Sequence, residues 1–173
     1  MRLWMVVAAV VIGLDQITKH LAMGLLHSHE PTVVLPFLNF DLAYNTGAAF
    51  SFLADSNGWQ RWFFVVLALG VSAMIVRWLR RLGPEERWNV VAMSLILGGA
   101  LGNAIDRIFF GHVIDFIDFY YVAGSCMPLF APLHLGDVFQ CHWPAFNLAD
   151  SAISVGAVMM ILDSVRPTKK AAS

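Results

Sequence analysis

The chain has 173 residues, of which 58% are hydrophobic and only 13% are charged. This balance lies outside the usual range of soluble globular domains and predicts a membrane protein. The formal net charge is −1 at pH 7, and no basic stripe with interleaved aromatic residues runs along the chain. We therefore expect no nucleic-acid partner.

Four segments are long and apolar enough to cross about 30 Å of hydrocarbon as helices. They cover residues 3–26, 62–79, 88–109 and 145–165. Arg2 precedes the first segment as in a signal peptide, but the apolar pattern resumes beyond Lys19 without a small-residue cleavage site. The sequence thus predicts an all-α polytopic membrane protein with four transmembrane helices in a single membrane-embedded domain, residues 1–173.

The basic residues predict the orientation of these helices, because cytoplasmic loops retain Lys and Arg. They gather at the N-terminus, between the second and third segments, and at the C-terminus: Arg2, Arg77, Arg80, Arg81, Arg87, Arg166, Lys169 and Lys170. Residues 111–147 contain neither Lys nor Arg. We expect both termini in the cytoplasm and two outer loops, at about 27–61 and 110–144.

The first segment carries two charges, Asp15 and Lys19, about 18 Å or more along the helix from Leu3. Their i, i+4 spacing suits a mutual ion pair, which is the simplest way to tolerate two buried charges. Alternatively, one of them orients a loop or a substrate backbone. Either reading places polar groups in the outer leaflet.

The first outer loop changes character, with Pro, Asn and Gly separating short β-prone pieces at 32–35 and 37–40. A small extracytoplasmic sheet is expected here. It is too short to have a core of its own, so we expect it to pack on the helix ends. The turn at 45–47 would reach the outer layer from above.

The third segment closes with small residues at 98–102, which permit close helix approach in lipid. Asn103 and Asp106 follow, and the same Asn-x-x-Asp spacing recurs at Asn147 and Asp150 in the fourth segment. At this spacing the amide and the acid share one helix face. Carboxylates at membrane depth predict function, here acid–base chemistry or an ion path.

The remaining acids of the outer half leave two readings open. Asp115 and Asp118 stand among apolar residues just after the third segment, either as interfacial acids in water or as functional groups. Arg107 neighbours Asp106 and points elsewhere, so each would pair separately, in a structural network or a functional one. The six histidines do not follow HExxH or a similar metal-ligand spacing. We therefore expect no metal site and no cofactor.

Two cysteines, Cys126 and Cys141, lie in the second outer loop. In an oxidising compartment they would form a disulfide, and otherwise they would be two free thiols packed among apolar side chains. Cys141 and His142 are sequence neighbours, an arrangement that seldom supports thiol catalysis. A small ion or proton-coupled transporter is the competing function, but beyond the recurring Asn-x-x-Asp spacing the sequence shows no internal repeat of the kind expected for it. A noncatalytic scaffold would not explain acids converging at one depth.

Five motifs in order resemble those of the lipoprotein signal peptidases, or signal peptidase II. They are LDQITK at 14–19, NTGAAFS at 45–51, GNAIDR at 102–107, VIDF at 113–116 and FNLADS at 146–151. The resemblance extends over nearly all of residues 3–162. It implies an intramembrane aspartyl endopeptidase of the bacterial inner membrane, cleaving diacylglyceryl-modified prolipoproteins before the lipidated cysteine.

The same resemblance assigns roles to residues. It implies that Asp115 and Asp150 are catalytic, which moves the partner of Asp150 from Asp106 to Asp115. Supporting or substrate-binding roles are implied for Asp15, Lys19, Asn45, Gly47, Asn103, Asp106, Arg107 and Asn147. The implied partners are lipidated prolipoprotein, membrane phospholipid and globomycin-type inhibitors, with the chain acting as a monomer. Residues 121–143 depart from the family as an enlarged loop, which leaves substrate gating open.

Overall fold

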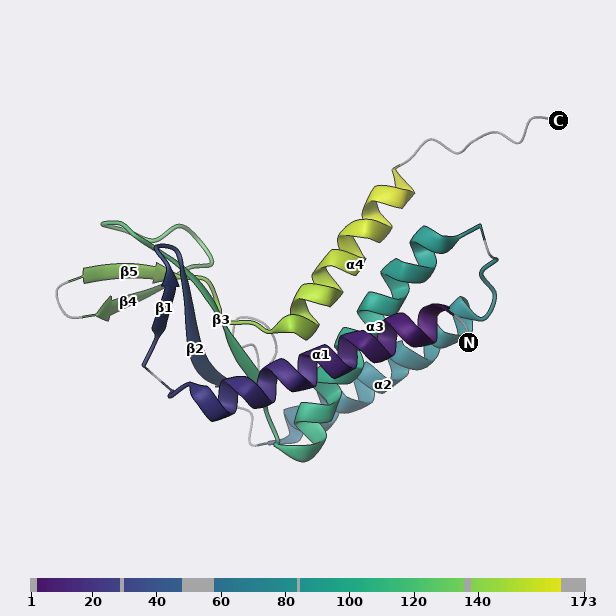
Figure 1. Cartoon of the computed structure of the whole chain (residues 1–173), viewed down its shortest axis with the longest axis horizontal. Coiled ribbons are helices and arrows are strands. Elements are labelled where there is room, and N and C mark those ends of the chain that lie inside the picture. The colour runs from purple at the N-terminus through teal and green to yellow at the C-terminus, as the bar shows by residue number, and fades with distance from the viewer. Residues whose placement is uncertain (1–2, 29, 48–57, 84, 136–137, 166–173) are drawn as a thin grey trace.

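The computed structural model describes residues 3–28, 30–47, 58–83, 85–135 and 138–165 (Figure 1). In chain order the elements are α1 (Leu3–Leu25), β1 (Thr32–Leu35), β2 (Leu38–Asn45), α2 (Trp59–Leu79), α3 (Arg87–Phe109), β3 (Val113–Val122), β4 (Ala131–Leu135), β5 (Val138–His142) and α4 (Leu148–Ser164). In this part of the chain α1, α2 and α3 are long and apolar enough to cross a membrane. The helices lie on one side of the molecule and the sheet on the other.

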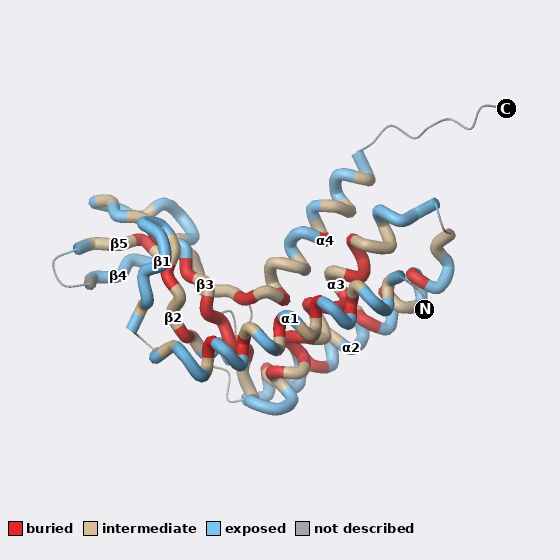
Figure 2. The backbone as a smooth tube through the Cα atoms, in the orientation of Figure 1, coloured by how far each residue is buried: buried red, intermediate tan, exposed pale blue. Residues whose placement is uncertain are grey.

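Helix α3 is the centre of the helical half, since it packs against α1, α2 and α4. Small residues allow this close approach. A Cβ at Gly98 would lie 2.7 Å from the Cβ of Val11 on α1, and a Cβ at Gly99 would overlap the backbone carbonyl of Ala149 on α4. Buried residues accordingly follow α3 along its length (Figure 2).

The predicted helices are present, with two shifted starts. Helix α2 begins at Trp59 rather than at 62. Helix α4 begins at Leu148 rather than at 145, because Phe146 is paired with Ile117 of β3 and Asn147 has an extended backbone. Tertiary pairing therefore keeps the chain extended up to the helix, where apolar composition alone predicts an earlier start.

The sheet has five antiparallel strands in the order β1-β2-β3-β5-β4. The first outer segment supplies β1 and β2, as expected. The second outer segment, expected at 110–144, supplies β3, β4 and β5, which the sequence did not predict. Strand β3 shows no apolar alternation where it begins, since its first four residues, 113–116, are all buried.

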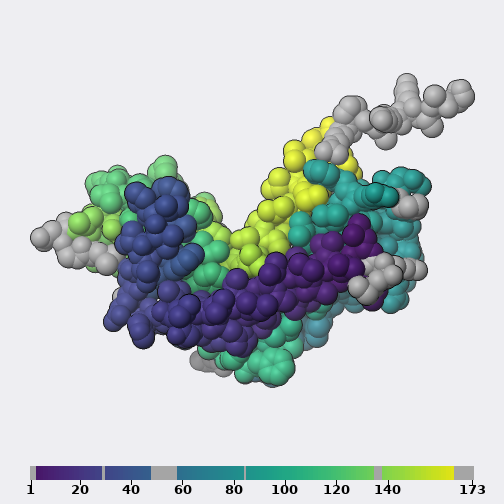
Figure 3. All heavy atoms as spheres, in the orientation of Figure 1, coloured from purple at the N-terminus to yellow at the C-terminus, as the bar shows by residue number. Residues whose placement is uncertain are grey.

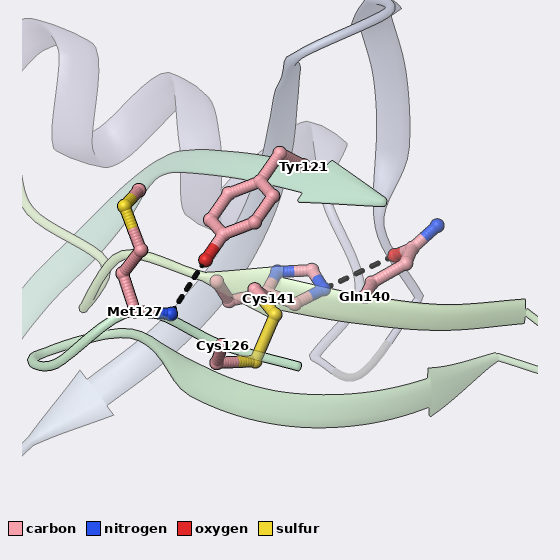
Figure 4. Close-up of a disulfide and its surroundings, with 6 residues drawn as sticks. Tyr121, Cys126, Met127, Gln140 and Cys141 are labelled. Carbon is pink, nitrogen blue, oxygen red and sulfur yellow. Dashed lines mark hydrogen bonds between the residues drawn. A yellow bond between two sulfur atoms is a disulfide. The ribbon is translucent and has the colours of Figure 1, made fainter. Parts of the chain in front are cut away.

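Within residues 121–143, β4 pairs with β5 and a disulfide ties β5 to the chain that precedes β4. Cys141 of β5 is bonded to Cys126, with 5.4 Å between their Cα atoms (Figure 4). The phenol oxygen of Tyr121 accepts a hydrogen bond of 2.7 Å from the backbone N–H of Met127. The two cysteines are therefore bridged, and the loop that carries Cys126 is fastened to the sheet.

Close packing of α3 against α4 gives a testable prediction. Gly99→Ala places a methyl group against the carbonyl of Ala149, so we expect a loss of about 1–3 kcal/mol in stability. Gly70→Ala on α2 is the matched control, because a Cβ there meets nothing within 4 Å. Thermal unfolding in detergent micelles should show a lower midpoint for Gly99→Ala only. An unchanged midpoint would mean that α3 and α4 lie further apart.

Candidate active site

Lys19 of α1 is completely buried and has a partner for each of its three ammonium protons. Its Nζ lies 2.9 Å from Asp15 Oδ2 and 2.6 Å from Asp106 Oδ2. It also donates a hydrogen bond of 2.8 Å to Asn103 Oδ1. Because an ammonium donates three hydrogen bonds, this set satisfies it fully. The predicted pair of Asp15 and Lys19 is thus part of a larger cluster joining α1 to α3.

The two carboxylates of this cluster extend it to the rest of the molecule. Asp15 Oδ1 accepts from the backbone N–H of Ala149 at 2.9 Å, at the start of α4. Asp106 Oδ2 accepts from the N–H of Ile114 at 3.3 Å, in β3. The side-chain amide of Gln16 donates to Asp106 Oδ1 at 2.8 Å. Sequence reasoning missed Gln16, although it lies inside the first motif as a polar residue on an apolar helix.

Asn103 connects the Lys19 cluster to Asp150. Its Oδ1 accepts from Lys19 Nζ and, at 3.2 Å, from Asn147 Nδ2. Two donors on one oxygen fix the orientation of the amide. Its Nδ2 therefore donates to Asp150 Oδ1, at 2.8 Å.

Asn147 holds both candidate acids at once. Its Nδ2 donates to Asp115 Oδ1 at 2.7 Å. As the N-cap of α4 it also forms a reciprocal capping box with Asp150: its Oδ1 accepts from the N–H of Asp150 at 3.0 Å, and its own N–H donates to Asp150 Oδ2 at 3.3 Å. One asparagine thus couples the carboxyl on β3 to the carboxyl on α4.

The turn after β2 approaches Asp115 from the other side. Asn45 Nδ2 donates to Asp115 Oδ2 at 3.2 Å, and Asn45 Oδ1 accepts from the N–H of Gly47 at 3.0 Å. Arg107 donates from Nη2 to the carbonyl of Gly47 at 2.7 Å, with its guanidinium 4.9 Å above the ring of Phe64. All ten residues expected at the site therefore lie in one connected network.

A cleft of about 810 Å³ opens onto this network. Its polar lining includes Asn45, Asn103, Arg107, Asp115 and Asp150, and its apolar lining includes Tyr44, Trp143, Phe146 and Ile153. The molecular surface is hollowed between the sheet and α4 (Figure 3). Both candidate acids are thus accessible from a cavity that is itself largely apolar.

The environment of Asp115 favours its protonated form. Burial, and next the negative charge of Asp150, raise the pKa of Asp115 to about 7, while hydrogen bonds from Asn45 and Asn147 oppose the shift. Two coupled carboxyls titrate as a pair, so near neutral pH they hold a proton between them. The site can therefore present one acid and one base together.

Asp118, the other acid of β3, lies apart from this site. It is 4% exposed, so it is not the interfacial acid in water that the sequence allows. Its Oδ2 lies 2.7 Å from His142 Nδ1 and accepts from Asn39 Nδ2 at 3.3 Å. In the described part of the chain no three His, Cys, Asp or Glu side chains are grouped as metal ligands.

Comparison with known proteins places these residues in a family context. A family model described as signal peptidase (SPase) II matches residues 7–166. The lipoprotein signal peptidase of Aeromonas hydrophila is 48% identical over 168 residues, covering 96% of this chain and 90% of that protein. That of Pseudomonas fluorescens is 47% identical over 167 residues, covering 96% and 89%.

The fold is also similar to that of a solved protein. A bacterial membrane enzyme, whose structure was determined by the in meso method at 1.9 Å resolution, superposes with a TM-score of 0.73 and 28% sequence identity. The match covers 95% of this chain and 94% of that chain. The fold is thus shared over nearly the whole length of both chains.

The coupling of the two acids predicts a change in titration. Asp150→Asn removes one of the two causes that raise the pKa of Asp115, so we expect this pKa to fall below about 7 yet to stay above 3.8, because burial remains. Infrared spectroscopy of the carboxyl band across pH would measure it, with Asp115→Asn identifying the band and Asp118→Asn leaving it in place. An unmodified enzyme in which Asp115 titrates at its ordinary value would contradict the coupling.

Proposed function

The chain belongs to the signal peptidase II family, and on this premise we propose that it hydrolyses its substrates by an aspartic mechanism with Asp115 and Asp150 as the catalytic pair. As a lipoprotein signal peptidase it is a membrane protease that removes signal peptides from prolipoproteins. The observation that supports the aspartic mechanism most directly is the pair of carboxyls that line the cleft and are linked through Asn147, with Asp115 buried and Asp150 partly buried.

In the proposed reaction the two acids take opposite parts. The ionised carboxylate removes a proton from a water molecule as the water oxygen attacks the scissile carbonyl carbon. The protonated carboxyl donates its hydrogen bond to the carbonyl oxygen, where negative charge develops. Collapse of the tetrahedral intermediate breaks the C–N bond as the leaving nitrogen takes the proton that the base removed from water. Because the pair shares its proton, neither role belongs to Asp115 or Asp150 alone.

The supporting residues act on geometry. Asn103 and Asn147 donate to the two carboxyls, and Lys19 holds the amide of Asn103 in the orientation that this requires. The remaining supporting residues form the Lys19 cluster and the turn beside Asp115: Asp15, Asp106, Asn45, Gly47 and Arg107. We assign the turn and the Arg107 guanidinium to binding the substrate backbone.

The position of the site fits a lipid-modified substrate. Asp150 lies in the first turn of α4 and Asp115 in β3, where the helices meet the sheet. A cut just before a diacylglyceryl-modified cysteine would leave the acyl chains in the outer leaflet while the peptide enters the largely apolar cleft from the side. The proposal includes contact with membrane phospholipid, inhibition by globomycin-type compounds in this cleft, and action as a monomer.

We further propose that α4 is a fourth transmembrane helix and that residues 1–173 form a single domain in the bacterial inner membrane. Apolar residues run along α4, which packs lengthwise on α3. Arg77, Arg80 and Arg81 lie at the end of α2 remote from the acids. Both termini would then lie in the cytoplasm, with the site near the periplasmic face.

This topology predicts the behaviour of reporter fusions. Green fluorescent protein fused at the C-terminus should fluoresce, and alkaline phosphatase at the same position should be inactive, because the first folds in the cytoplasm and the second in the periplasm. The same reporters inserted at Gly124, in the second outer segment, should give the reverse pattern. Active phosphatase at the C-terminus would contradict a fourth span.

The catalytic pair is tested by paired amide substitutions. Asp115→Asn and Asp150→Asn should each abolish cleavage of a diacylglyceryl-modified prolipoprotein, a loss of at least about 100-fold, because an amide neither takes nor donates the transferred proton. Gel-shift assays with purified enzyme, on the lipidated and unlipidated precursor, measure it. Only the lipidated form should be cut by the unmodified enzyme.

Asp163→Asn is the matched control, since Asp163 lies at the opposite end of α4 and accepts a hydrogen bond from Asn89. It should retain normal activity. Asp106→Asn removes a partner of Lys19 rather than a reacting acid, so its loss of activity should be smaller and accompanied by a loss of stability. Near-normal turnover by either Asp115→Asn or Asp150→Asn would refute the pair.

A further inference from the structure

The segment between β5 and α4 carries one wall of the cleft. The backbone N–H of Trp143 donates to the carbonyl of Phe119 at 2.7 Å, and Phe146 is paired with Ile117. The antiparallel pairing of β5 with β3 therefore continues along β3 toward Asp115. Trp143 and Phe146 line the cleft from this segment.

The ring of Trp143 packs against another aromatic side chain, Phe130. Its ring meets that of Phe130 edge to face, with 5.3 Å between the centroids, and Phe130 meets Tyr121 in the same way at 5.0 Å. Such edge-to-face pairs are favourable and directional. The position of Phe130 therefore determines where the indole of Trp143 is supported.

The loop that carries Phe130 is fixed by the disulfide. Cys126 is bonded to Cys141 (Figure 4). The N–H of Phe130 donates to the carbonyl of Met127 at 3.2 Å. Leu129 has a φ of +76°, and it is the only residue other than glycine with a positive φ in the described part of the chain. A leucine keeps this conformation only where its surroundings impose it. Leu129 is the third residue of the turn that the Phe130–Met127 hydrogen bond closes, and Pro128 at the second position favours the turn type that needs a positive φ there.

From this chain of contacts we propose that Trp143 is a specificity-determining residue, which contacts the prolipoprotein on the mature side of the cut, and that the Cys126–Cys141 disulfide positions it through Phe130. The proposal rests on the proposed function. Signal peptides are apolar and would lie with the helices, whereas Trp143 is hydrogen-bonded to Phe119, which lies further along β3 than Asp115. The polypeptide that follows the lipidated cysteine must leave the membrane in this direction, and an indole offers it a broad, rigid surface.

Two lipidated precursors test the contact, one with its full mature sequence and one truncated a few residues after the cysteine. Trp143→Ala should raise KM about tenfold for the long precursor, as expected for loss of a buried aromatic anchor, with kcat unchanged. For the short precursor KM should not change. Equal effects on both precursors would assign Trp143 to the acyl chains or to folding and would overturn the proposal, as would no effect on either. Trp143→Phe should restore most of the affinity.

The supporting role of the disulfide is tested in the same assay. The double variant Cys126→Ser/Cys141→Ser and the variant Phe130→Ala should each raise KM for the long precursor only. Unchanged KM in both would overturn the positioning role. Trp78→Ala is the matched control, because Trp78 is an exposed tryptophan on α2, and it should behave as the unmodified enzyme.

The outcome is separable from that of the proposed function. Asp115→Asn should be inactive on both precursors whatever Trp143 does. If Asp115→Asn is inactive while Trp143→Ala leaves both KM values unchanged, the catalytic assignment stands and the specificity proposal fails. If Asp115→Asn is active, the catalytic assignment fails, and a precursor-dependent effect of Trp143→Ala would still support the contact.

Discussion

The buried ammonium of Lys19 is the interaction on which the rest of the structure depends. A cation without water is tolerated only when charges and hydrogen bonds replace its hydration, and Asp15, Asp106 and Asn103 do so here. The same carboxylates accept backbone N–H groups at Ala149 and Ile114, so the cation indirectly positions α4 and β3. Gly102 of α3 makes this contact possible, because a Cβ at this position would collide with the carboxylate of Asp15.

The site uses one residue type in two environments. Asp15 and Asp106 face an ammonium, and their charges neutralise it within the helices. Asp115 and Asp150 instead face the uncharged amides of Asn147 and Asn103. An amide orients a carboxyl without binding its charge as tightly as a cation would, so the proton of the second pair stays available for exchange. The two amides thus link the second pair to the ionic cluster, and the charge of Lys19 also acts to lower the pKa of Asp115.

Much of this was predictable from local pattern, and the remainder depends on contacts between distant residues. The length of the apolar segments predicted the helices. The acids placed at one depth in the membrane predicted the candidate site. The repeated Asn-x-x-Asp spacing was misleading, since the amide of Asn147 meets Asp115 of β3 and not Asp106. Strand β3 was not predicted because residues 113–116 are all buried and so do not alternate between apolar and polar. The start of α4 depends on the pairing of Phe146 with Ile117. The bridge between Cys126 and Cys141 is equally non-local, because spacing alone left free thiols open.

The disulfide also imposes an order on how the molecule is built. In the proposed topology its two thiols meet an oxidant only after the second outer segment has been translocated across the membrane. The ionic cluster and the amides need no oxidant, so they form once the helices have associated and β3 has been translocated. Biogenesis would therefore have two stages, with the acids assembled first and the wall beside them completed by oxidation. A cell with a reducing envelope would accumulate a protein in which Asp115 and Asp150 are assembled but the disulfide that positions Trp143 against the precursor has not formed.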